Sequence, residues 1–223
     1  MPPLRLIGML DSPYVRRVAI SMHCLGVPFE HEAVSVVSTF PQFQRINPVV
    51  KAPTLVCPDG EVLMDSSLIL QFIEATHGQA NGQGPKLWPA DAQSLQHDFR
   101  ALSLAMAACD KGVQSIYERK LRPADKQHGP WLDRVRGQLV AALAGLEQAV
   151  AQRPEALAPV QGQPTRQAGI TAAIAWQFVG EVEPGLAQAA LHPALATLAA
   201  QMEATEAFKR FPPVGPGVSP PKG

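Results

Sequence analysis

The sequence predicts an α/β domain followed by an all-helical domain, and three features of the chain support this prediction. Residues 1–78 alternate between strand-like and helix-like segments. Residues 79–89 are rich in glycine, glutamine and proline, which is typical of a linker. From residue 90 onward the strand signals vanish and only helical patterns remain. We therefore expect domains at 1–78 and 90–210, with an extended tail at 211–223.

The composition is that of a folded protein without a strong charge bias. Hydrophobic residues make up 46% of the chain and charged residues 17%, which argues against disorder. Basic and acidic residues both number 19, so no net charge favours nucleic acid or an anionic membrane as a partner. The chain shows neither a signal-peptide pattern nor an apolar run of about 18 residues. Its three cysteines are scattered, so we expect a cytoplasmic protein.

The first domain has the predicted element order β-α-β-α-β-β-α. Apolar runs predict strands at 4–8, 29–34, 54–57 and 62–64, and a turn sequence at 58–61 joins the last two. A parallel crossover followed by a hairpin predicts a thioredoxin-like domain. Helices are expected from Pro13 to a stop at Gly26, from Phe40 to Ile46, and from Asp65 onward. The side chains expected to be buried are Val15, Val18, Ala19 and Met22 in the first helix, and Leu68, Ile69, Phe72 and Ile73 in the third.

The second domain is predicted to consist of helices separated by short Pro/Gly stretches. The candidate helices cover 91–117, 130–152, 165–179 and 193–205. The tail from Phe211, with the sequence FPPVGPGVSPPKG, cannot continue a helix because of its prolines. We expect the tail to be extended or disordered.

Three short segments of the first domain carry candidate chemistry: DSPYVRR at 11–17, NPVVKAPTL at 47–55 and MDSSLI at 64–69. Ser12 precedes a helix, where free N–H groups and the helix dipole favour an anion such as a thiolate. Asp65 and Ser66 also open a helix. Both Ser12 and Asp65 have a structural alternative, which is plain helix capping.

In order and spacing, these three segments resemble those of the glutathione transferases. The helical second half is also similar to that family, so the resemblance covers nearly the whole chain. It implies a glutathione-transferase architecture, with a glutathione-binding first domain and a homodimeric assembly. It also implies that Ser12 stabilises the thiolate of glutathione.

The resemblance assigns the other glutathione contacts to the second and third segments. It implies a cis bond before Pro53, which presents the backbone of Ala52 to the cysteinyl part of glutathione. Lys51 matches a position near the glycine carboxylate, although an ordinary solvated lysine is the alternative. The resemblance implies that Asp65 binds the ammonium of the γ-glutamyl group and that Ser66 binds the neighbouring carboxylate. A zwitterionic ligand end needs such a pair of an acceptor and a donor.

The electrophile is expected between the first domain and the long helices of the second, as in the family. Tyr14, Met106, Cys109, Asp110 and Tyr117 are the candidate lining residues. The same residues at helical spacing are also typical of a plain core. A pocket of aromatic and sulfur side chains would accept diverse small apolar electrophiles.

The leading expectation is a glutathione transferase that conjugates glutathione to such electrophiles. Thiol-transferase relatives have a cysteine where this chain has Ser12, so disulfide exchange through a mixed disulfide is excluded at that site. A glutathione-dependent isomerase or dehalogenase remains an alternative, as does a non-catalytic binding protein on the same fold. The histidines lack metal-ligand spacing, so no metal is proposed.

The environments of three further residues near Ser12 can also be predicted. A carboxylate beside Ser12 would oppose a thiolate, so Asp11 is expected to point to solvent. Arg17 either adds positive potential or pairs with a surface carboxylate. Cys24 is expected to be a small buried apolar residue.

The start of the helix near residue 167 departs from the family pattern. Aligned on Gln167–Ala168, Arg166 and Gly169 replace the expected Ser/Thr and Asp of the capping box. Thr165 is expected to cap the helix from one position earlier.

Overall fold

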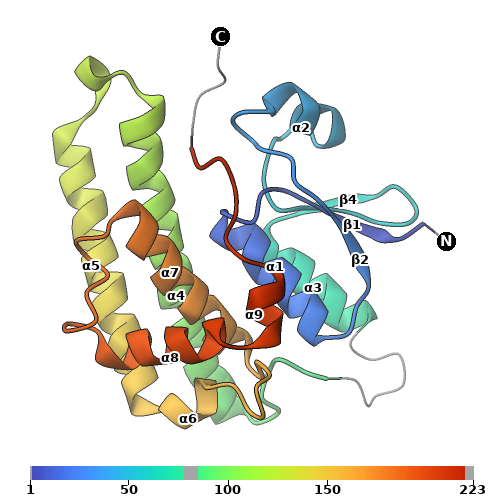
Figure 1. Ribbon diagram of the computed structural model, residues 1–223, viewed down its shortest axis with the longest axis vertical. Helices are drawn as coiled ribbons and strands as arrows, with labels where there is room; N and C mark the ends of the chain where they lie inside the picture. The colour runs from blue at the N-terminus through green and yellow to red at the C-terminus, as the bar shows by residue number, and fades with distance from the viewer. Residues whose placement is uncertain (1, 78–84, 219–223) are drawn as a thin grey trace. The chain divides into compact units, whose positions relative to one another are not determined.

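The structure consists of two compact units. The computed structural model describes residues 2–77 and 85–218. One unit comprises Met1–Leu87 with Ala207–Gly223, and the other comprises Trp88–Glu206 (Figure 1). Most of the expected linker, residues 79–84, lies outside the described residues. Of its remainder, Leu87 is buried and groups with the first unit.

The first unit contains a mixed four-stranded sheet with the strand order β2-β1-β3-β4. Strand β1 pairs parallel with β2 and antiparallel with β3, and β3 pairs antiparallel with β4. The βαβαββα order confirms the predicted thioredoxin-like domain. The elements are β1 (Leu4–Ile7), α1 (Pro13–Cys24), β2 (Phe29–Glu32), α2 (Phe40–Ile46), β3 (Thr54–Val56), β4 (Val62–Met64) and α3 (Ser66–Thr76).

The predicted core face of α1 is confirmed, whereas that of α3 is partly wrong. Every apolar residue predicted to be buried in α1 has no exposed surface. In α3, Ile69 and Ile73 are buried as predicted, but Leu68 is 60% exposed and Leu70 is buried instead. Leu68, Ile69 and Leu70 are consecutive apolar residues, and each points about 100° around the helix axis from the one before. The sequence alone therefore does not decide which of them lies on the buried face.

A short helix and the tail that follows it belong to the first unit. Helix α9 (Glu206–Arg210) is only five residues long, and the sequence does not predict it. Its Phe208 is fully buried, and the guanidinium of Arg16 lies 5.1 Å from the Phe208 ring centroid. Residues 211–218 form no helix or strand, in agreement with their proline content.

The second unit is entirely helical among its described residues. Helix α4 packs against α5 and α7, and α7 packs against α8. Helix α7 is buried on most of its circumference, as its nearly continuous apolar sequence requires. In the part of the chain that the structure describes, no helix combines the length and apolar character needed to cross a membrane. The elements are α4 (Ala92–Leu121), η1 (Ala124–Lys126), α5 (Gly129–Gln152), α6 (Pro154–Leu157), α7 (Gln167–Val182) and α8 (Pro193–Glu203).

The start of α7 differs from the expectation based on Thr165. The N-cap residue is Arg166, which makes no capping hydrogen bond with its side chain. Its guanidinium instead pairs with the buried carboxylate of Asp98 on α4 at 3.4 Å. Gly169 packs directly against the backbone carbonyl of Leu157, where a Cβ atom would overlap the oxygen. This chain therefore replaces the capping box with an ion pair and a close backbone contact.

Helix α8 receives its cap from a distant side chain, which local sequence patterns do not predict. The carboxylate of Glu147 on α5 accepts hydrogen bonds from the backbone N–H groups of Ala194 and Leu195, at 3.0 and 2.8 Å. These groups lie in the first turn of α8, where helical N–H groups lack intrahelical partners. A negative charge at this position is also favoured by the helix dipole.

Candidate functional site

Ser12 is the N-cap residue of α1, but its hydroxyl does not cap the helix. Its backbone has the extended conformation of an N-cap residue, and its carbonyl accepts from the N–H of Arg16 at 3.0 Å. Within residues 2–77 and 85–218, the Ser12 side chain makes no capping hydrogen bond. The simple capping role therefore does not account for the hydroxyl, which is half-buried and can donate a hydrogen bond to a ligand.

A buried hydrogen-bond relay shapes the loop before β3. The Asn47 amide donates to Thr54 Oγ1 at 2.8 Å, and that hydroxyl donates to the carbonyl of Lys51 at 2.8 Å. The bond between Ala52 and Pro53 is cis, as the resemblance implies. Asn47 and Thr54 are both buried. Sequence reasoning selected this segment but gave these two residues no role, because their burial becomes visible only in the structure.

Gly8 allows the segment before α1 to pack closely against the loop that contains Ala52. A Cβ atom on Gly8 would lie 2.6 Å from a methyl group of Val15 and 3.3 Å from the Cβ of Ala52. Its φ of +140° is also a conformation that glycine adopts readily and other residues do not. The segment that leads to Ser12 and the loop that presents Ala52 therefore meet at a position without a side chain.

Two residues of the candidate glutathione-binding segments have a positive φ. Val50 has a φ of +53° and precedes Lys51, and Asp65 has a φ of +70° and precedes Ser66. This region is unusual for a β-branched residue and costs of order 1–3 kcal/mol. Such conformations cluster at functional sites, where the surrounding structure imposes them. Both lie beside residues that the resemblance assigns to the ligand.

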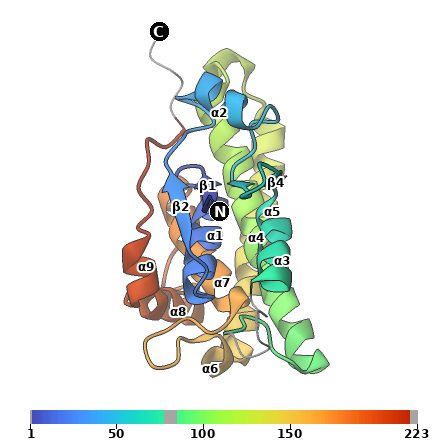
Figure 2. The same ribbon diagram turned by 90° about the vertical axis from the view of Figure 1, so that its right-hand side faces the viewer.

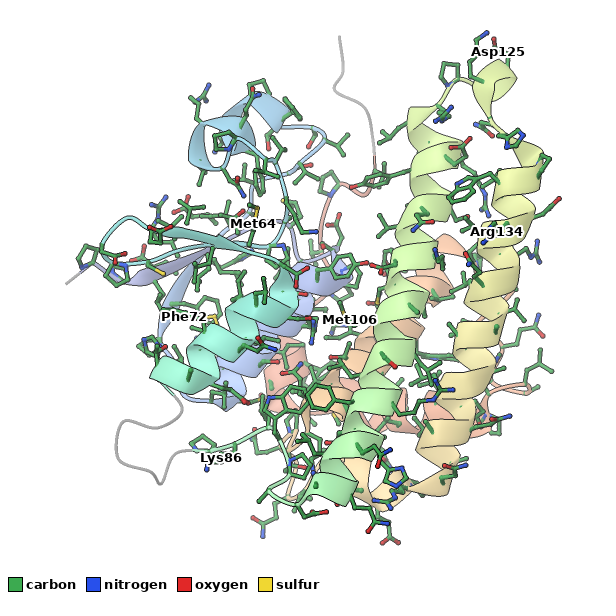
Figure 3. All side chains as sticks on the ribbon, turned by 180° about the vertical axis from the view of Figure 1, so that it is seen from behind. Met64, Phe72, Lys86, Met106, Asp125 and Arg134 are labelled. Carbon is green, nitrogen blue, oxygen red and sulfur yellow. The ribbon has the colours of Figure 1, made fainter. Side chains whose placement is uncertain are left out.

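Asp65 caps α3 and also faces a lysine. Its Oδ1 atom accepts from the N–H of Ser67 at 2.9 Å, so the predicted capping alternative is present. Its Oδ2 atom lies 4.0 Å from the Nζ of Lys51, and both side chains are exposed. Figure 3 labels Met64, the last residue of β4, which directly precedes Asp65. The carboxylate thus keeps one oxygen available for a cation while the other holds the helix.

Arg17 is buried beneath the start of α3 and does not lie on the surface. The side chain is 1% exposed, and Nη1 donates to the hydroxyls of Ser66 and Ser67 at 3.0 and 3.1 Å. Arg17 therefore contacts two serines of α3 from a buried position. Because the Ser66 oxygen accepts from Arg17, its hydroxyl proton is available for donation to a ligand.

Asp11 does not simply point to solvent, in contrast to the expectation. The residue is half-buried, and Oδ2 accepts a hydrogen bond from the backbone N–H of Gly217 in the C-terminal tail at 2.8 Å. The tail lies more than 200 positions away in the sequence. Local patterns could not have predicted this contact.

The candidate electrophile residues lie in separate units. Tyr14 is on α1 of the first unit, and the other four are on α4 of the second, where Figure 3 labels Met106. Cys109 is only 1% exposed, whereas Asp110 and Tyr117 are exposed. Whether the five residues share a pocket stays a prediction. Among the described residues, no cluster of three or more His, Cys, Asp or Glu side chains could hold a metal ion.

The Cys24 thiol is expected to be unreactive in the folded protein. Burial raises its pKa from an ordinary value of 9.0 to about 11. Only the thiolate is nucleophilic, and a rise of about two pKa units lowers the fraction of Cys24 thiolate at neutral pH roughly a hundredfold. Alkylation of the native and denatured protein at equal pH, followed by mass spectrometry, measures the difference. Equal labelling rates for Cys24 in both states would contradict the burial argument.

Comparisons with known proteins agree with the fold. Residues 6–82 match the family model "Glutathione S-transferase, N-terminal domain". A glutathione S-transferase of Methylobacterium radiotolerans, solved in complex with glutathione sulfonate, superposes with a TM-score of 0.81 at 29% identity, covering 99% of this chain and 96% of that one. A glutathione transferase family member of Pseudomonas fluorescens with bound glutathione superposes with a TM-score of 0.77 at 28% identity, covering 98% and 100%.

Curated relatives match over shorter stretches. The GST-like protein YibF of Escherichia coli is 29% identical over 65% of this chain and 68% of its own length. Several plant glutathione S-transferases align over about a third of their own length. The thioredoxin-like unit, the helical unit and the matches across nearly the whole length of bacterial structures all lead to one conclusion. The chain belongs to the glutathione S-transferase superfamily.

Proposed function

We propose that this protein is a serine-type glutathione transferase that conjugates reduced glutathione to small apolar electrophiles. The observation that carries the proposal is the Ser12 hydroxyl, which stands at the N-terminus of α1 without capping it. A side chain that neither caps the helix nor lies in the core is available for a ligand. The N-terminus of α1 adds a favourable potential for an anion at the same place.

The γ-glutamyl end of glutathione would lie at the start of α3. Asp65 would accept from the ammonium group through the oxygen that does not cap the helix. Ser66 would donate its hydroxyl to the carboxylate, because Arg17 already donates to the Ser66 oxygen. The buried guanidinium behind these serines also adds positive charge on the carboxylate side.

The remainder of glutathione would extend along the loop before β3. The backbone of Ala52, ahead of the cis bond to Pro53, would pair with the cysteinyl part. Lys51 would approach the glycine carboxylate. Its distance of 4.0 Å from Asp65 and its exposure leave it free to move toward a ligand. In this arrangement the cysteinyl sulfur would point toward Ser12.

Ser12 would then lower the pKa of the bound thiol. A hydrogen bond to a charged group contributes about 1.5–3 kcal/mol, and about 1.36 kcal/mol corresponds to one pKa unit. The pKa of a thiol that is ordinarily about 8.5 would fall to about 6.5–7.5, so that roughly a quarter to three quarters of the bound thiol would be ionised at pH 7. The thiolate attacks an electrophilic carbon, forming a carbon–sulfur bond as the leaving group departs with its electron pair. The protein itself forms no covalent intermediate.

The electrophile and the assembly complete the proposal. We place the electrophile near Tyr14, Met106, Cys109, Asp110 and Tyr117, of which Asp110 and Tyr117 are exposed. The protein is also proposed to be a homodimer. This part rests on the resemblance to the glutathione transferases.

Replacing Asp65 with asparagine should weaken glutathione binding roughly 10- to 100-fold. Asparagine tolerates a positive φ and caps helices as well as aspartate does, so the fold should be retained. The change removes the negative charge that would face the ammonium, a charged hydrogen bond worth about 1.5–3 kcal/mol. It also removes the exposed ion pair with Lys51, whose contribution is small. Isothermal titration calorimetry with reduced glutathione gives the dissociation constant of both proteins.

Asp91→Asn is the matched control for this experiment. Asp91 also caps a helix, accepting from the N–H of Ser94 at 2.8 Å, but it belongs to the helical unit. Its replacement should leave the dissociation constant unchanged. Equal affinity for glutathione in the Asp65→Asn variant and the unmodified protein would remove Asp65 from the proposed site.

A further inference from the structure

The C-terminal tail lies against the residue that directly precedes Ser12. The N–H of Gly217 donates to Asp11 Oδ2 at 2.8 Å. Gly215 packs against the same carboxylate so closely that a Cβ atom at this position would overlap the Asp11 oxygens. A hydrogen bond and a close contact therefore fix one carboxylate from two tail residues.

The tail is also fixed at its beginning, six residues before Gly217. The carbonyl of Phe211 accepts from Arg16 Nε at 2.8 Å. The Phe211 ring stacks on Phe29 with the centroids 5.8 Å apart, and it meets the His23 ring edge-on at the same distance. Residues 211–217 are thus held at both ends by α1 and its flanking segments, which makes them a strap.

The strap lies on the side of α1 away from α3. Figure 2 shows α9 and the tail on the β2 side of α1, whereas α3 and β4 lie on its other side; the stacking of Phe211 on Phe29, the first residue of β2, agrees with this placement. The proposed glutathione contacts Asp65 and Ser66 are at the start of α3. The hydrogen bond from Gly217 commits one oxygen of the Asp11 carboxylate to the tail, so this carboxylate is not free to turn toward a ligand beside Ser12.

The strap holds the Asp11 carboxylate without a positively charged side chain. Its residues, FPPVGPG, include no charged side chain, so they hold Asp11 through a backbone donor and through shape. A carboxylate close to a bound thiol disfavours the thiolate and raises its pKa. Other charged groups near the proposed ligand are Arg17 on α1, Lys51 before β3 and Asp65 at α3, and their contacts with Ser66 and with one another do not involve the strap. Arg16 does contact the strap, through the carbonyl of Phe211, which the shortened chain keeps.

We propose that the C-terminal strap is a positioning element that keeps the Asp11 charge from opposing the glutathione thiolate beside Ser12. This inference rests on the proposed function. It assigns a role to a pair of residues, Asp11 and Gly217, that flank the site from opposite ends of the chain. It also explains why a residue unfavourable to a thiolate can stand next to Ser12.

Ending the chain at Val214 tests the strap. The shortened protein keeps Phe211 and its contacts, so the packing of α9 should be retained, which its thermal transition will verify. The pKa of bound glutathione, followed by the ultraviolet absorbance of the thiolate across a pH series, should rise by about one unit relative to the full chain. Asp11→Asn in the shortened chain should cancel the rise, because the opposing charge is then absent.

Gly215→Ala provides a second test in the full-length chain. The new methyl group would overlap the end of the Asp11 side chain, which can rotate aside more easily than the backbone can move. The thiol pKa should shift in the same direction as in the shortened chain. Val214→Ala is the matched control, because Val214 is 66% exposed and its side chain has no part in holding Asp11.

The outcomes separate this inference from the proposed function. If the full chain lowers the thiol pKa and the shortened chain lowers it equally, the role of the strap is overturned while the proposed function stands. A rise that persists in the Asp11→Asn background overturns the role of Asp11. If the full chain does not lower the thiol pKa, the proposed function fails, and this inference fails with it.

Discussion

Replacing Ser12 with alanine should raise the pKa of bound glutathione by about one to two units while leaving its affinity nearly intact. The hydroxyl contributes a hydrogen bond to the thiolate, worth about 1.5–3 kcal/mol, whereas the contacts at Lys51, Ala52, Asp65 and Ser66 are unchanged. The conjugation rate at pH 7 should fall by about 8- to 25-fold, in proportion to the lost thiolate. At pH values above the raised pKa, the rates of the two proteins should converge. A pH series of rate and thiolate absorbance measures both effects.

The conservative variant Ser12→Thr serves as the control. It keeps a hydroxyl at the N-cap position, where threonine is also well tolerated, and should retain a lowered thiol pKa. An alanine variant whose bound thiol titrates like that of the unmodified protein would remove Ser12 from the mechanism. Another group would then have to stabilise the thiolate of bound glutathione.

Replacing Gly169 with alanine should destabilise the helical unit by about 3 kcal/mol. A Cβ atom there would overlap the carbonyl oxygen of Leu157 and lie 2.9 Å from the Met202 side chain. The first neighbour is backbone and cannot rotate away, so helix α7 or the segment carrying Leu157 must move. Forcing extra volume into a packed interior typically costs about 1–3 kcal/mol, and contact with backbone belongs at the upper end. Chemical denaturation of both proteins measures the change in the free energy of unfolding.

Gly137→Ala is the matched control, with the opposite expected sign. Gly137 also lies within a helix, α5, but a Cβ atom there would meet no other atom within 4 Å. Alanine should therefore stabilise the helix by about 0.8–1 kcal/mol through its higher propensity. A Gly169→Ala variant as stable as the Gly137→Ala variant would contradict the close packing at the start of α7.

The sequence predicted the thioredoxin-like element order because each element carries a local signal. The apolar spacing in α1 placed Val15, Val18, Ala19 and Met22 correctly, and the turn at 58–61 located the β3–β4 hairpin. The short helices α6 and α9 escaped prediction because four or five residues contain too few turns for a helical period to be recognised. The exposure of Leu68 escaped because three consecutive apolar residues fit more than one helical phase.

The candidate site was predictable where residues act locally and not where distant residues meet. Ser12, Asp65 and Ser66 all stand at helix starts, and their positions follow from the sequence. The contacts of Arg17 and Asp11 join residues 49 and 206 positions apart. An arginine or aspartate is ordinarily exposed, so nothing in its local sequence indicates that a serine pair or a tail glycine will hold it.

The capping of α7 and α8 illustrates the same limit in the helical unit. The sequence shows that the family capping box is altered, and Thr165 was a reasonable local substitute. The structure uses long-range partners, the Arg166–Asp98 ion pair at α7 and the Glu147 carboxylate at α8. Burial raises the pKa of the Asp98 carboxyl, and the Arg166 charge opposes that rise. A cap supplied from another helix becomes recognisable only when the packing of the helices is known.

The central claim is that the first unit holds reduced glutathione, and calorimetric titration of the purified protein tests it most directly. The proposal predicts saturable binding, accompanied by an increase in the thermal transition temperature as glutathione is added. The weaker binding of the Asp65→Asn variant would place the ligand at the start of α3. The absence of both heat and thermal stabilisation at millimolar glutathione would contradict the claim and favour a non-catalytic member of the superfamily.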